Sequence, residues 1–390
     1  MSTELKRQAI ELFRQRFGAA PRAIGIAPGR VELLGNHTDY NGGYILAIAL
    51  DRCVAVAGAP LPGGRLEIAS AFFDRTVGNA IGEWRKDESE HWTHYIVGTL
   101  KELAEAGAPV GGMQLAVAST VPLGSGLSSS AALEVATAQL ALALYPFAIE
   151  PMALAQLCQR AENRFVGVNC GLLDQFCAMF GRENSGLFLD CLTLEHSASP
   201  IGSDDVAVVV ANSMTKHALV AGEYNKIRHD CMEAARKIGE ARGKPAQLLR
   251  EIAMEDFEAH KAALSDMEAR RARHILTENQ RVLDGLAAAA RGDIQTVGRL
   301  MFGSHASSRD DLMNSCPELD ALIELAREAP GAIGAKLSGG GFGGCTVNLV
   351  RKGQAEAFAA HLAEGFEKRM GQKPEIHFCA IGPGARSELL

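Results

Sequence analysis

Residues 128–144, SSSAALEVATAQLALAL, predict a helix that is apolar on nearly every side. A helix of this kind has no face suited to water, so it must lie inside a large core. A glycine turn, VPLGSGL, comes directly before this helix, and GMQLAVAST, which predicts a strand, comes before the turn. This order favours a layered α+β fold in which strands and helices pack on one another.

The turn and helix start, PLGSGLSSSAAL at residues 122–133, form a candidate phosphate-binding segment. Gly124 and Gly126 allow a tight turn and a close approach of the backbone to a ligand. Free amides and a partial positive charge at the start of a helix attract anions. The segment lacks the Gly-Lys ending of a P-loop, and Ser129 replaces the last glycine of a dinucleotide motif. An ordinary serine-capped turn would have the same residues, so both interpretations stay open.

Two further segments combine glycine with polar residues. LSGGGFGGC, residues 337–345, has five glycines in six positions between apolar strands. The high backbone entropy of such a run indicates close packing or a ligand rather than a loose turn. APGRVELLGNHTDYNGG, residues 27–43, is dense in side chains that suit hydroxyl recognition, although a solvated turn would explain His37 taken alone.

Composition argues against several classes of protein. The chain has 390 residues and a net charge of −7, and the absence of a basic run argues against a nucleic-acid partner. Its nine cysteines, an odd number without a C-x-x-C pair, favour reduced thiols over a disulfide framework or a zinc site. We find no signal-peptide pattern and no apolar stretch long enough to span a membrane, so we expect a cytoplasmic protein.

The remaining pattern predicts two domains. Helices are expected at residues 4–18, at 151–180 with a break at 167–171, over much of 214–330, and at 354–369. We place a boundary in the polar stretch SASPIGSDD, which gives domains 1–200 and 201–390. The last expected strand, IHFCAIG, is a candidate to pack back on the first domain.

In their order and spacing, the three glycine-rich segments resemble the three motifs of the GHMP small-molecule kinases. Gly29-Arg30-Val31 followed by HTDYNG is similar to the signature of galactokinases within that superfamily. The similarity continues in AENRFVGVNCGLLDQF, GEYNKIR and SRDDLMNSCPELD, so it covers nearly the whole chain. The resemblance implies a GHMP kinase fold: a mixed-sheet N-terminal domain, a ferredoxin-like C-terminal α/β-plait domain, and an active site between them.

The resemblance also implies an activity, the phosphorylation of the C1 hydroxyl of galactose by ATP. Asp174 is implied beside that hydroxyl, with Arg30 close to it and to the γ-phosphate. The implied sugar contacts are Asn36, His37, Asp39, Gly171 and Tyr224. The implied ATP site contains Gly124, Ser125, Gly126, Leu127, Ser128, Ser129, Ser130, Gly340 and Gly341, and the implied Mg²⁺ ligands are Ser130 and Glu162. The implied partners are Mg-ATP and a small sugar, and we expect a monomer.

The chemistry of these residue types fits phosphoryl transfer, which depends on positioning and charge stabilisation. Mg²⁺ takes few protein oxygens beside phosphates, so one serine and one carboxylate suffice. Asp174 lies in an apolar stretch, CGLLDQFCAMF, where a carboxylate without a partner or a task would be expensive. Glu162 carries less evidence, because an acid on the surface of a helix would look the same.

The chain departs from the usual galactokinase pattern at two positions. Glu32 stands where asparagine is usual, and Asn36 stands where the family has a glutamate expected to contact the sugar C6 hydroxyl. A carboxylate only accepts hydrogen bonds, whereas an amide both donates and accepts. Either Asn36 still binds a C6 hydroxyl, which we prefer because the exchange looks compensatory, or the pocket takes a C6-altered sugar such as galacturonate.

Three other functions compete with galactose phosphorylation. A related kinase could act on N-acetylgalactosamine, which needs room near C2 that a sequence does not show. A galactose and ATP sensor without catalysis would be expected to lose a catalytic group, yet Arg30, Glu162 and Asp174 are all present. A binding or scaffold protein of α+β type is the third, and stabilisation of the fold by Mg-ATP would count against it.

Overall fold

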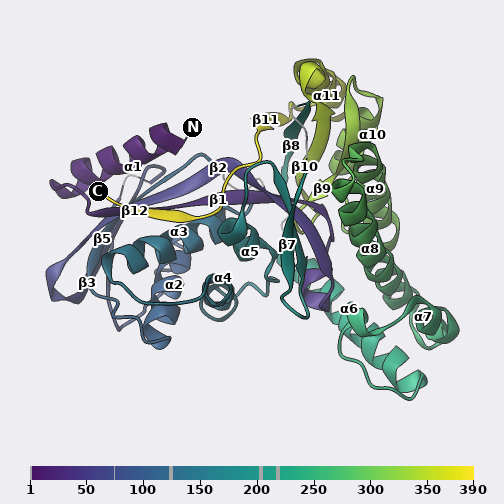
Figure 1. Ribbon diagram of the computed structural model, residues 1–390, viewed down its shortest axis with the longest axis horizontal. Coiled ribbons are helices and arrows are strands. Elements are labelled where there is room, and N and C mark those ends of the chain that lie inside the picture. Colours follow the sequence, from purple (N-terminus) through teal and green to yellow (C-terminus); the bar gives the residue numbers. More distant parts are fainter. Residues whose placement is uncertain (1, 74, 123–125, 202–204, 217–219) are drawn as a thin grey trace.

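The computed structural model describes residues 2–73, 75–122, 126–201, 205–216 and 220–390. Two sheets lie next to each other, one built mainly from the first half of the chain and one from the second (Figure 1). Helices cover both, which confirms the predicted α+β class. We propose that the two sheets mark two domains that divide near residue 200. None of the described helices combines the length and the apolar character that a membrane crossing requires.

The first sheet has eight strands in the order β12-β1-β2-β5-β3-β4, with β6 added beside β2 and β7 beside β6. Its pairings are antiparallel except that between β3 and β5, so it is a mixed sheet. Its strands are β1 (Ala23–Leu34), β2 (Tyr44–Pro60), β3 (Arg65–Ser70), β4 (Val77–Ala80), β5 (Met113–Ser119), β6 (Ser185–Asp190), β7 (His196–Pro200) and β12 (Arg386–Leu389).

Helices cover both faces of the first sheet (Figure 1). The helix α1 (Ser2–Phe17) buries Leu5 and Phe13 against one face, and α3 (Ser129–Leu144) packs on the other. A Cβ at Gly25 in β1 would lie 2.0 Å from the carbonyl oxygen of Ala136, so this glycine lets α3 approach the strand closely. The buried helix predicted at residues 128–144 is therefore confirmed. The other helices on this side are α2 (Thr93–Glu105), α4 (Pro151–Arg160) and α5 (Leu173–Phe180).

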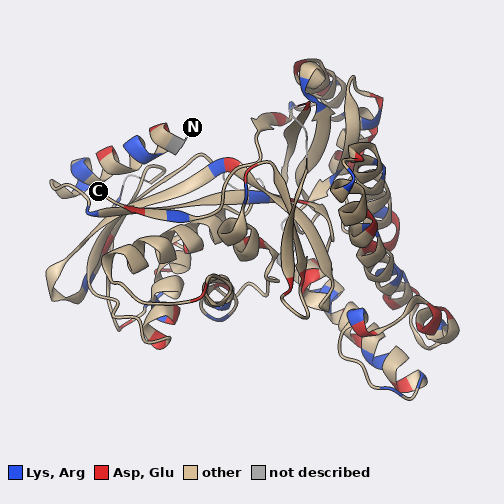
Figure 2. Cartoon of the chain, in the orientation of Figure 1, with Lys and Arg blue, Asp and Glu red and all other residues tan. Residues whose placement is uncertain are grey.

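The second sheet is antiparallel throughout, in the order β11-β8-β10-β9. Helices α10 and α11 bury Leu322, Phe358 and Phe366 against it. Acidic and basic residues are interspersed along the outer helices α6 and α8 (Figure 2). The strands are β8 (Val206–Lys216), β9 (Ala332–Ser338), β10 (Gly343–Arg351) and β11 (Glu375–Cys379), and the helices are α6 (Val220–Ala241), α7 (Met254–His260), α8 (Asp266–Ala290), α9 (Ile294–Ser307), α10 (Pro317–Glu328) and α11 (Ala355–Met370).

The C-terminal segment contacts both sheets. Residues 376–379 of the expected strand IHFCAIG belong to β11 and pair with β8 in the second sheet, whereas residues 380–382 meet β2 of the first sheet: Ala380 accepts from the Asp51 amide, the Gly382 amide donates to Ala49, and Ile381 bridges to Leu50. The chain then returns, and β12 pairs with β1 from Ala23↔Leu389 to Ile26↔Arg386. The C-terminal residues thus join the two sheets at two places, through the expected segment and through β12, a short strand that was not expected. Strands β3 and β4 and helix α2 were not predicted from the sequence.

Candidate active site

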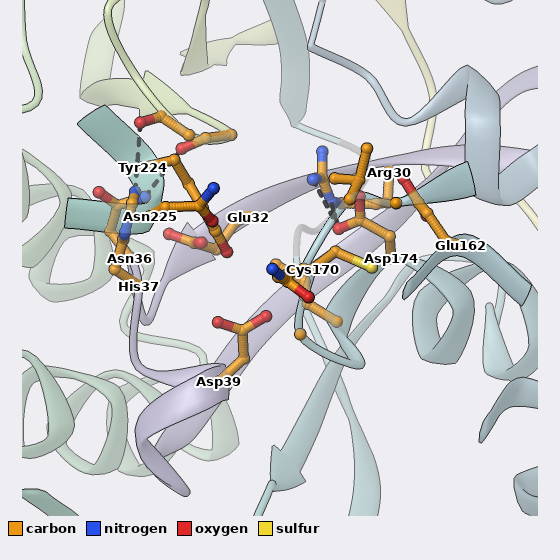
Figure 3. Close-up of a pocket in the computed structure, with 17 residues that line it drawn as sticks. Arg30, Glu32, Asn36, His37, Asp39, Glu162, Cys170, Asp174, Tyr224 and Asn225 are labelled. Atoms are coloured by element: carbon orange, nitrogen blue, oxygen red, sulfur yellow. Dashed lines mark hydrogen bonds and ion pairs between the residues drawn. The ribbon is translucent and has the colours of Figure 1, made fainter. Parts of the chain in front are cut away.

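A cavity of about 390 Å³ lies where the two halves of the chain meet. We call it the central cavity. Strand β1, the loop that follows it, α5, α6 and the glycine turn after β9 all contribute to its wall (Figure 3). It brings together residues that are far apart in the sequence: Arg30, Glu32, Asn36, His37, Asp39, Glu162, Cys170, Gly171, Asp174, Tyr224, Asn225, Gly339 and Gly340 are among its lining residues.

Arg30 and Asp174 form an ion pair in this wall, as Figure 3 shows. The arginine donates from Nε to Asp174 Oδ1 over 2.8 Å, and its Nη2 lies 2.6 Å from the same oxygen. Ser128 donates from Oγ to the second carboxylate oxygen over 2.6 Å. Both oxygens of Asp174 therefore have partners, and its side chain keeps 22% of its surface exposed. The acid and the guanidinium meet at the start of α3, as the sequence interpretation required.

Ser128 is the residue that precedes α3. Its backbone has φ 57° and ψ 49°, a left-handed conformation, and its side chain makes no capping hydrogen bond to the helix. The hydroxyl is turned to Asp174 instead. Gly126 accepts a hydrogen bond from Arg30 Nη1 at its carbonyl oxygen over 2.8 Å, and the carbonyl oxygen of Leu127 accepts one from the Arg30 amide. The predicted ATP residues Gly124 and Ser125 lie outside the described residues.

Asp39 and Gly171 touch on another side of the central cavity. A Cβ at Gly171 would lie 1.7 Å from Oδ2 of Asp39, so no side chain fits at this position unless the aspartate moves. Burial raises the pKa of Asp39 to about 7, and the nearby Asp174 carboxylate adds to the shift. In Figure 3 the Asp39 carboxylate points toward the middle of the cavity. An acceptor held in this way suits the hydroxyl of a ligand.

Replacing Gly171 with alanine should raise the KM for the sugar substrate by about 10- to 100-fold, because the new methyl group displaces the Asp39 carboxylate. The KM for ATP should stay within about twofold. Steady-state kinetics with each substrate varied in turn measures both values. Gly222→Ala is the matched control, since a Cβ there meets nothing within 4 Å. An unchanged sugar KM in Gly171→Ala would contradict a binding role for Asp39.

His37 belongs to an aromatic group with Tyr40 and Tyr224, with ring centroids 5.0 to 5.6 Å apart. Its Nε2 lies 3.2 Å from the carbonyl oxygen of Gly340, which can only accept, so Nε2 carries the proton. Its Nδ1 then accepts from the Tyr40 hydroxyl over 2.6 Å. Burial lowers the pKa of His37 to about 3, so the ring is neutral at ordinary pH.

Asn36 is completely enclosed by protein, with an exposed fraction of 0%. Its amide donates to the carbonyl oxygen of Gly339 over 3.0 Å. Its Oδ1 accepts from Ser308 over 3.3 Å and from Asn314 over 3.0 Å. The residue therefore ties the loop at residues 35–43, which we call the signature loop, to the second half of the chain.

The buried carboxylate of Glu278 in α8 also holds the signature loop. Its Oε1 accepts from the amide of Gly35 over 2.9 Å and from the Ser304 hydroxyl over 2.6 Å. Its Oε2 accepts from Arg281 Nε over 2.8 Å. His274, one turn earlier on α8, contacts the carbonyl oxygen of Asn36 through Nε2 over 3.0 Å. None of these contacts was predicted from the sequence.

Glu162 lies in a π-helical turn (Ala161–Val166), and it is buried rather than on a helix surface. Gln175 Nε2 donates both to Glu162 Oε2 over 2.8 Å and to Glu134 Oε2 over 2.9 Å. Burial, together with the charge of Asp174, raises the pKa of Glu162 to about 7. Burial and the charge of Glu162 also raise the pKa of Glu134, whose Oε1 has no hydrogen-bond partner in the described part of the chain.

Beyond burial, the charges of Glu162 and Asp174 raise the pKa of Glu134, and the charge of Asp174 raises the pKa of Glu162. Such a group of carboxylates fits a hard cation, because a divalent ion would offset negative charge that the protein leaves unbalanced. Among the described residues, no three His, Cys, Asp or Glu side chains converge to cage a metal. A Mg²⁺ ion here would therefore depend on few protein oxygens and on the oxygens of a ligand.

A second cavity, of about 250 Å³, has an aromatic wall and includes Ser129 and Ser130 at the first turn of α3. The rings of Phe73 and Trp92 stack there, with centroids 5.5 Å apart and planes inclined by 14°. Phe72 and Tyr95 complete this wall. We call it the aromatic cavity. The sequence interpretation missed it, although two adjacent phenylalanines and a tryptophan in an otherwise polar stretch were a visible signal.

The two glycines predicted to bind ATP in the third motif lie in different surroundings. Gly340 lines the central cavity beside Tyr224 and accepts from His37. Gly341 packs so closely that a Cβ would lie 2.0 Å from the carbonyl oxygen of Asn314. Their neighbour Gly339 approaches Gly126, so this turn supports the start of α3.

Comparison with known proteins agrees with this geometry. The galactokinase galactose-binding signature matches residues 11–60, the GHMP kinases N terminal domain matches residues 94–182, and the GHMP kinases C terminal model matches residues 286–368. The chain is 40% identical over 390 residues to the galactokinase of Actinobacillus succinogenes, covering 97% of this chain and 98% of that protein. It is 39% identical over 376 residues to the galactokinase of Homo sapiens, covering 93% and 92%.

Solved structures give the same result. The fold matches Lactococcus lactis galactokinase complexed with galactose with a TM-score of 0.92 and 31% identity, covering 100% of both chains. A mevalonate kinase shares the fold with a TM-score of 0.65 at 16% identity, covering 92% of this chain and 98% of that one. The chain therefore belongs to the galactokinase family of the GHMP kinases.

Proposed function

We propose that this protein transfers the γ-phosphoryl group of ATP to the C1 hydroxyl of galactose, which gives α-galactose 1-phosphate and ADP. The observation that carries the proposal is the contact of Asp174 with both Arg30 and Ser128 at the start of α3. An acid, a guanidinium and a helix start are the parts that phosphoryl transfer needs: a group for the nucleophile and positive charge for the phosphates.

Asp174 acts on the attacking hydroxyl in this mechanism. Oδ1 already faces two guanidinium nitrogens of Arg30, whereas Oδ2 accepts only from Ser128 among the described residues and keeps a lone pair for the C1 hydroxyl of the sugar. The carboxylate accepts or orients the hydroxyl proton as the oxygen attacks phosphorus. Arg30 stabilises the charge that spreads over the transferring phosphoryl group. The wall that surrounds the sugar is formed by His37, Asp39, Gly171, Tyr224 and Asn36.

The nucleotide spans the two cavities in our proposal. The aromatic cavity takes the adenine ring, because stacked rings offer flat apolar faces to a purine. Ser129 and Ser130 lie in that cavity, so the phosphates pass the first turn of α3 and reach Arg30 and Asp174 in the central cavity. Ser130 and Glu162 would hold Mg²⁺, which neutralises phosphate charge when it is bound.

The test is a coupled assay of ADP release with Mg-ATP and galactose, galacturonate, fucose or N-acetylgalactosamine. Galactose should give the highest kcat/KM, and omission of Mg²⁺ should abolish turnover. Binding of galactose and ATP without ADP release would favour the sensor and overturn the proposal. Preference for galacturonate or N-acetylgalactosamine would reassign the substrate.

A further inference from the structure

Glu32 lies in the wall of the central cavity, but the mechanism gives it no role. It lies two residues after Arg30 in β1, so the two side chains face the same side of the strand. Its Oε1 accepts a hydrogen bond from Lys336 in β9. In the described part of the chain, Lys336 is the only residue that hydrogen-bonds or ion-pairs with this side chain. The second carboxylate oxygen, Oε2, is therefore left with both lone pairs.

A structural role for this buried pair does not account for the free oxygen. The pair joins the first sheet to the second, and one oxygen suffices for that contact. Oε2 is not among the enclosed polar atoms of the described residues that lack a partner, so it is open to the cavity and can accept from whatever donor occupies it. Glu32 keeps 2% of its surface exposed, toward the cavity that it lines, so a donor can come from a ligand.

Asn36 is less suited to the same task. It has no exposed surface, and its amide oxygen already accepts from Ser308 and Asn314. The amide can offer at most one remaining N–H to a ligand, since the other goes to Gly339. A hydroxyl that must donate a hydrogen bond on this side of the cavity therefore meets Glu32 rather than Asn36.

The charge around the cavity points to a neutral hydroxyl as the donor. Four carboxylates line it, those of Glu32, Asp39, Glu162 and Asp174. Among the described residues that line it, Arg30 is the only arginine, and there is no lysine. Lys336 is fully buried and directed at Glu32, so it is not available to an anionic group of a ligand. A sugar carboxylate would meet like charge at this wall.

We propose that Glu32 is a specificity-determining residue, whose Oε2 accepts a hydrogen bond from a sugar hydroxyl other than that at C1, while Lys336 holds the carboxylate in place. This inference rests on the proposed function. It predicts that the enzyme selects a sugar that donates at this point and rejects a sugar acid. It also accounts for the exchange of Glu32 and Asn36, because the carboxylate moves to the position that keeps access to the cavity.

The informative variant is Glu32→Gln. The Gln oxygen can still accept from Lys336, and the amide nitrogen then occupies the place of Oε2, where it donates instead of accepting. The contact with Lys336 is thus preserved, whereas the atom that faces the sugar changes from an acceptor to a donor. Glu67→Gln is a matched control, because Glu67 bonds to Gln114 and Arg65 in the first sheet and does not line the cavity. The double variant Glu32→Gln/Lys336→Gln removes both charges of the pair, so it tests the loss of the carboxylate without leaving a buried lysine unpaired.

Galactose and the four galactoses that lack the hydroxyl at C2, C3, C4 or C6 form the sugar panel. Calorimetric titration gives the Kd of each sugar, and ADP release gives KM and kcat. In Glu32→Gln the Kd and KM for galactose should rise about 10- to 100-fold, with kcat and the KM for ATP within about threefold of wild type. For one of the deoxy sugars, the Kd of wild type and the Kd of Glu32→Gln should agree within about twofold. The hydroxyl that this sugar lacks is then the one that donates to Glu32.

The two failures can be told apart. If wild type releases no ADP with galactose, the proposed function is wrong. If wild type is active and Glu32→Gln loses the same factor on galactose and on all four deoxy sugars, the effect is structural and the inference is overturned. It is also overturned if both Glu32 variants bind galactose as tightly as the Glu67→Gln control does.

Discussion

Replacing Asp174 with asparagine should lower kcat by about 1000-fold and leave the affinity for Mg-ATP within about threefold of wild type. Asparagine has nearly the same shape, so its oxygen can still accept from Arg30. Its amide cannot take a proton from the sugar hydroxyl, and it no longer balances the guanidinium. Turnover from ADP release and the Kd of ATP from calorimetry measure the two effects separately.

Asp310→Asn is the matched control, because the Asp310 carboxylate forms an exposed ion pair with Arg309 and Asp310 lies outside both cavities. It should change neither quantity. If Asp174→Asn kept a tenth or more of wild-type turnover, Asp174 would be an orienting group of little consequence, and the charge of Arg30 would carry most of the catalysis. A parallel loss of ATP binding would instead show that the carboxylate supports the nucleotide site.

Elements whose burial follows from a local pattern of side chains are the ones that the sequence predicts best. The helix α3 was predictable because nearly all its side chains are apolar, which leaves burial as the only stable arrangement. The pairing of Arg30 with Asp174, 144 positions apart, has no local signal and came from resemblance to a family. The contact of the Ser128 hydroxyl with Asp174 had no signal in the sequence either, because it depends on a left-handed backbone at Ser128.

Other parts of the site could have been found from burial arguments. Lys336 follows an apolar run in β9, AIGAKLS, and a lysine in a buried strand requires an acidic partner. Such reasoning would have predicted a pair, although not that Glu32 is the partner. Glu278 gave no comparable signal, because acids are ordinary on a helix as charged as α8. Its burial follows only from how α8 packs against the end of β1.

The loop that shapes the sugar wall is therefore held by residues outside it. From α8, Glu278 accepts from the Gly35 amide and His274 contacts the carbonyl oxygen of Asn36. From beyond α9, Ser308 and Asn314 donate to the side-chain oxygen of Asn36. The stability of the fold and the geometry of the cavity consequently depend on the same buried hydrogen bonds. A variant in this network should affect both, unlike a variant at Asp174, which should affect turnover alone.

Glu278→Ala should lower the free energy of unfolding by about 3 kcal/mol at pH 7, because it leaves Arg281, Ser304 and the amide of Gly35 without an acceptor. Burial alone would raise the pKa of Glu278, but Arg281 and the other positive and donor groups around it outweigh burial and hold it below its usual value. A carboxyl with a lowered folded-state pKa stabilises the protein above its unfolded pKa of 4.5. The difference between wild type and variant should therefore be full at pH 7 and shrink as the pH falls below about 4.5.

Urea unfolding of Glu278→Ala, followed by both tryptophan fluorescence and circular dichroism, measures this difference at each pH. Glu233→Ala is the control, since Glu233 forms a solvent-exposed pair with Arg236 and its loss should leave the free energy of unfolding close to that of wild type. The sugar KM should rise in Glu278→Ala more than the KM for ATP, because the signature loop loses its anchor on α8. A loss of stability with an unchanged sugar KM would mean that Asn36 and His274 hold the loop by themselves.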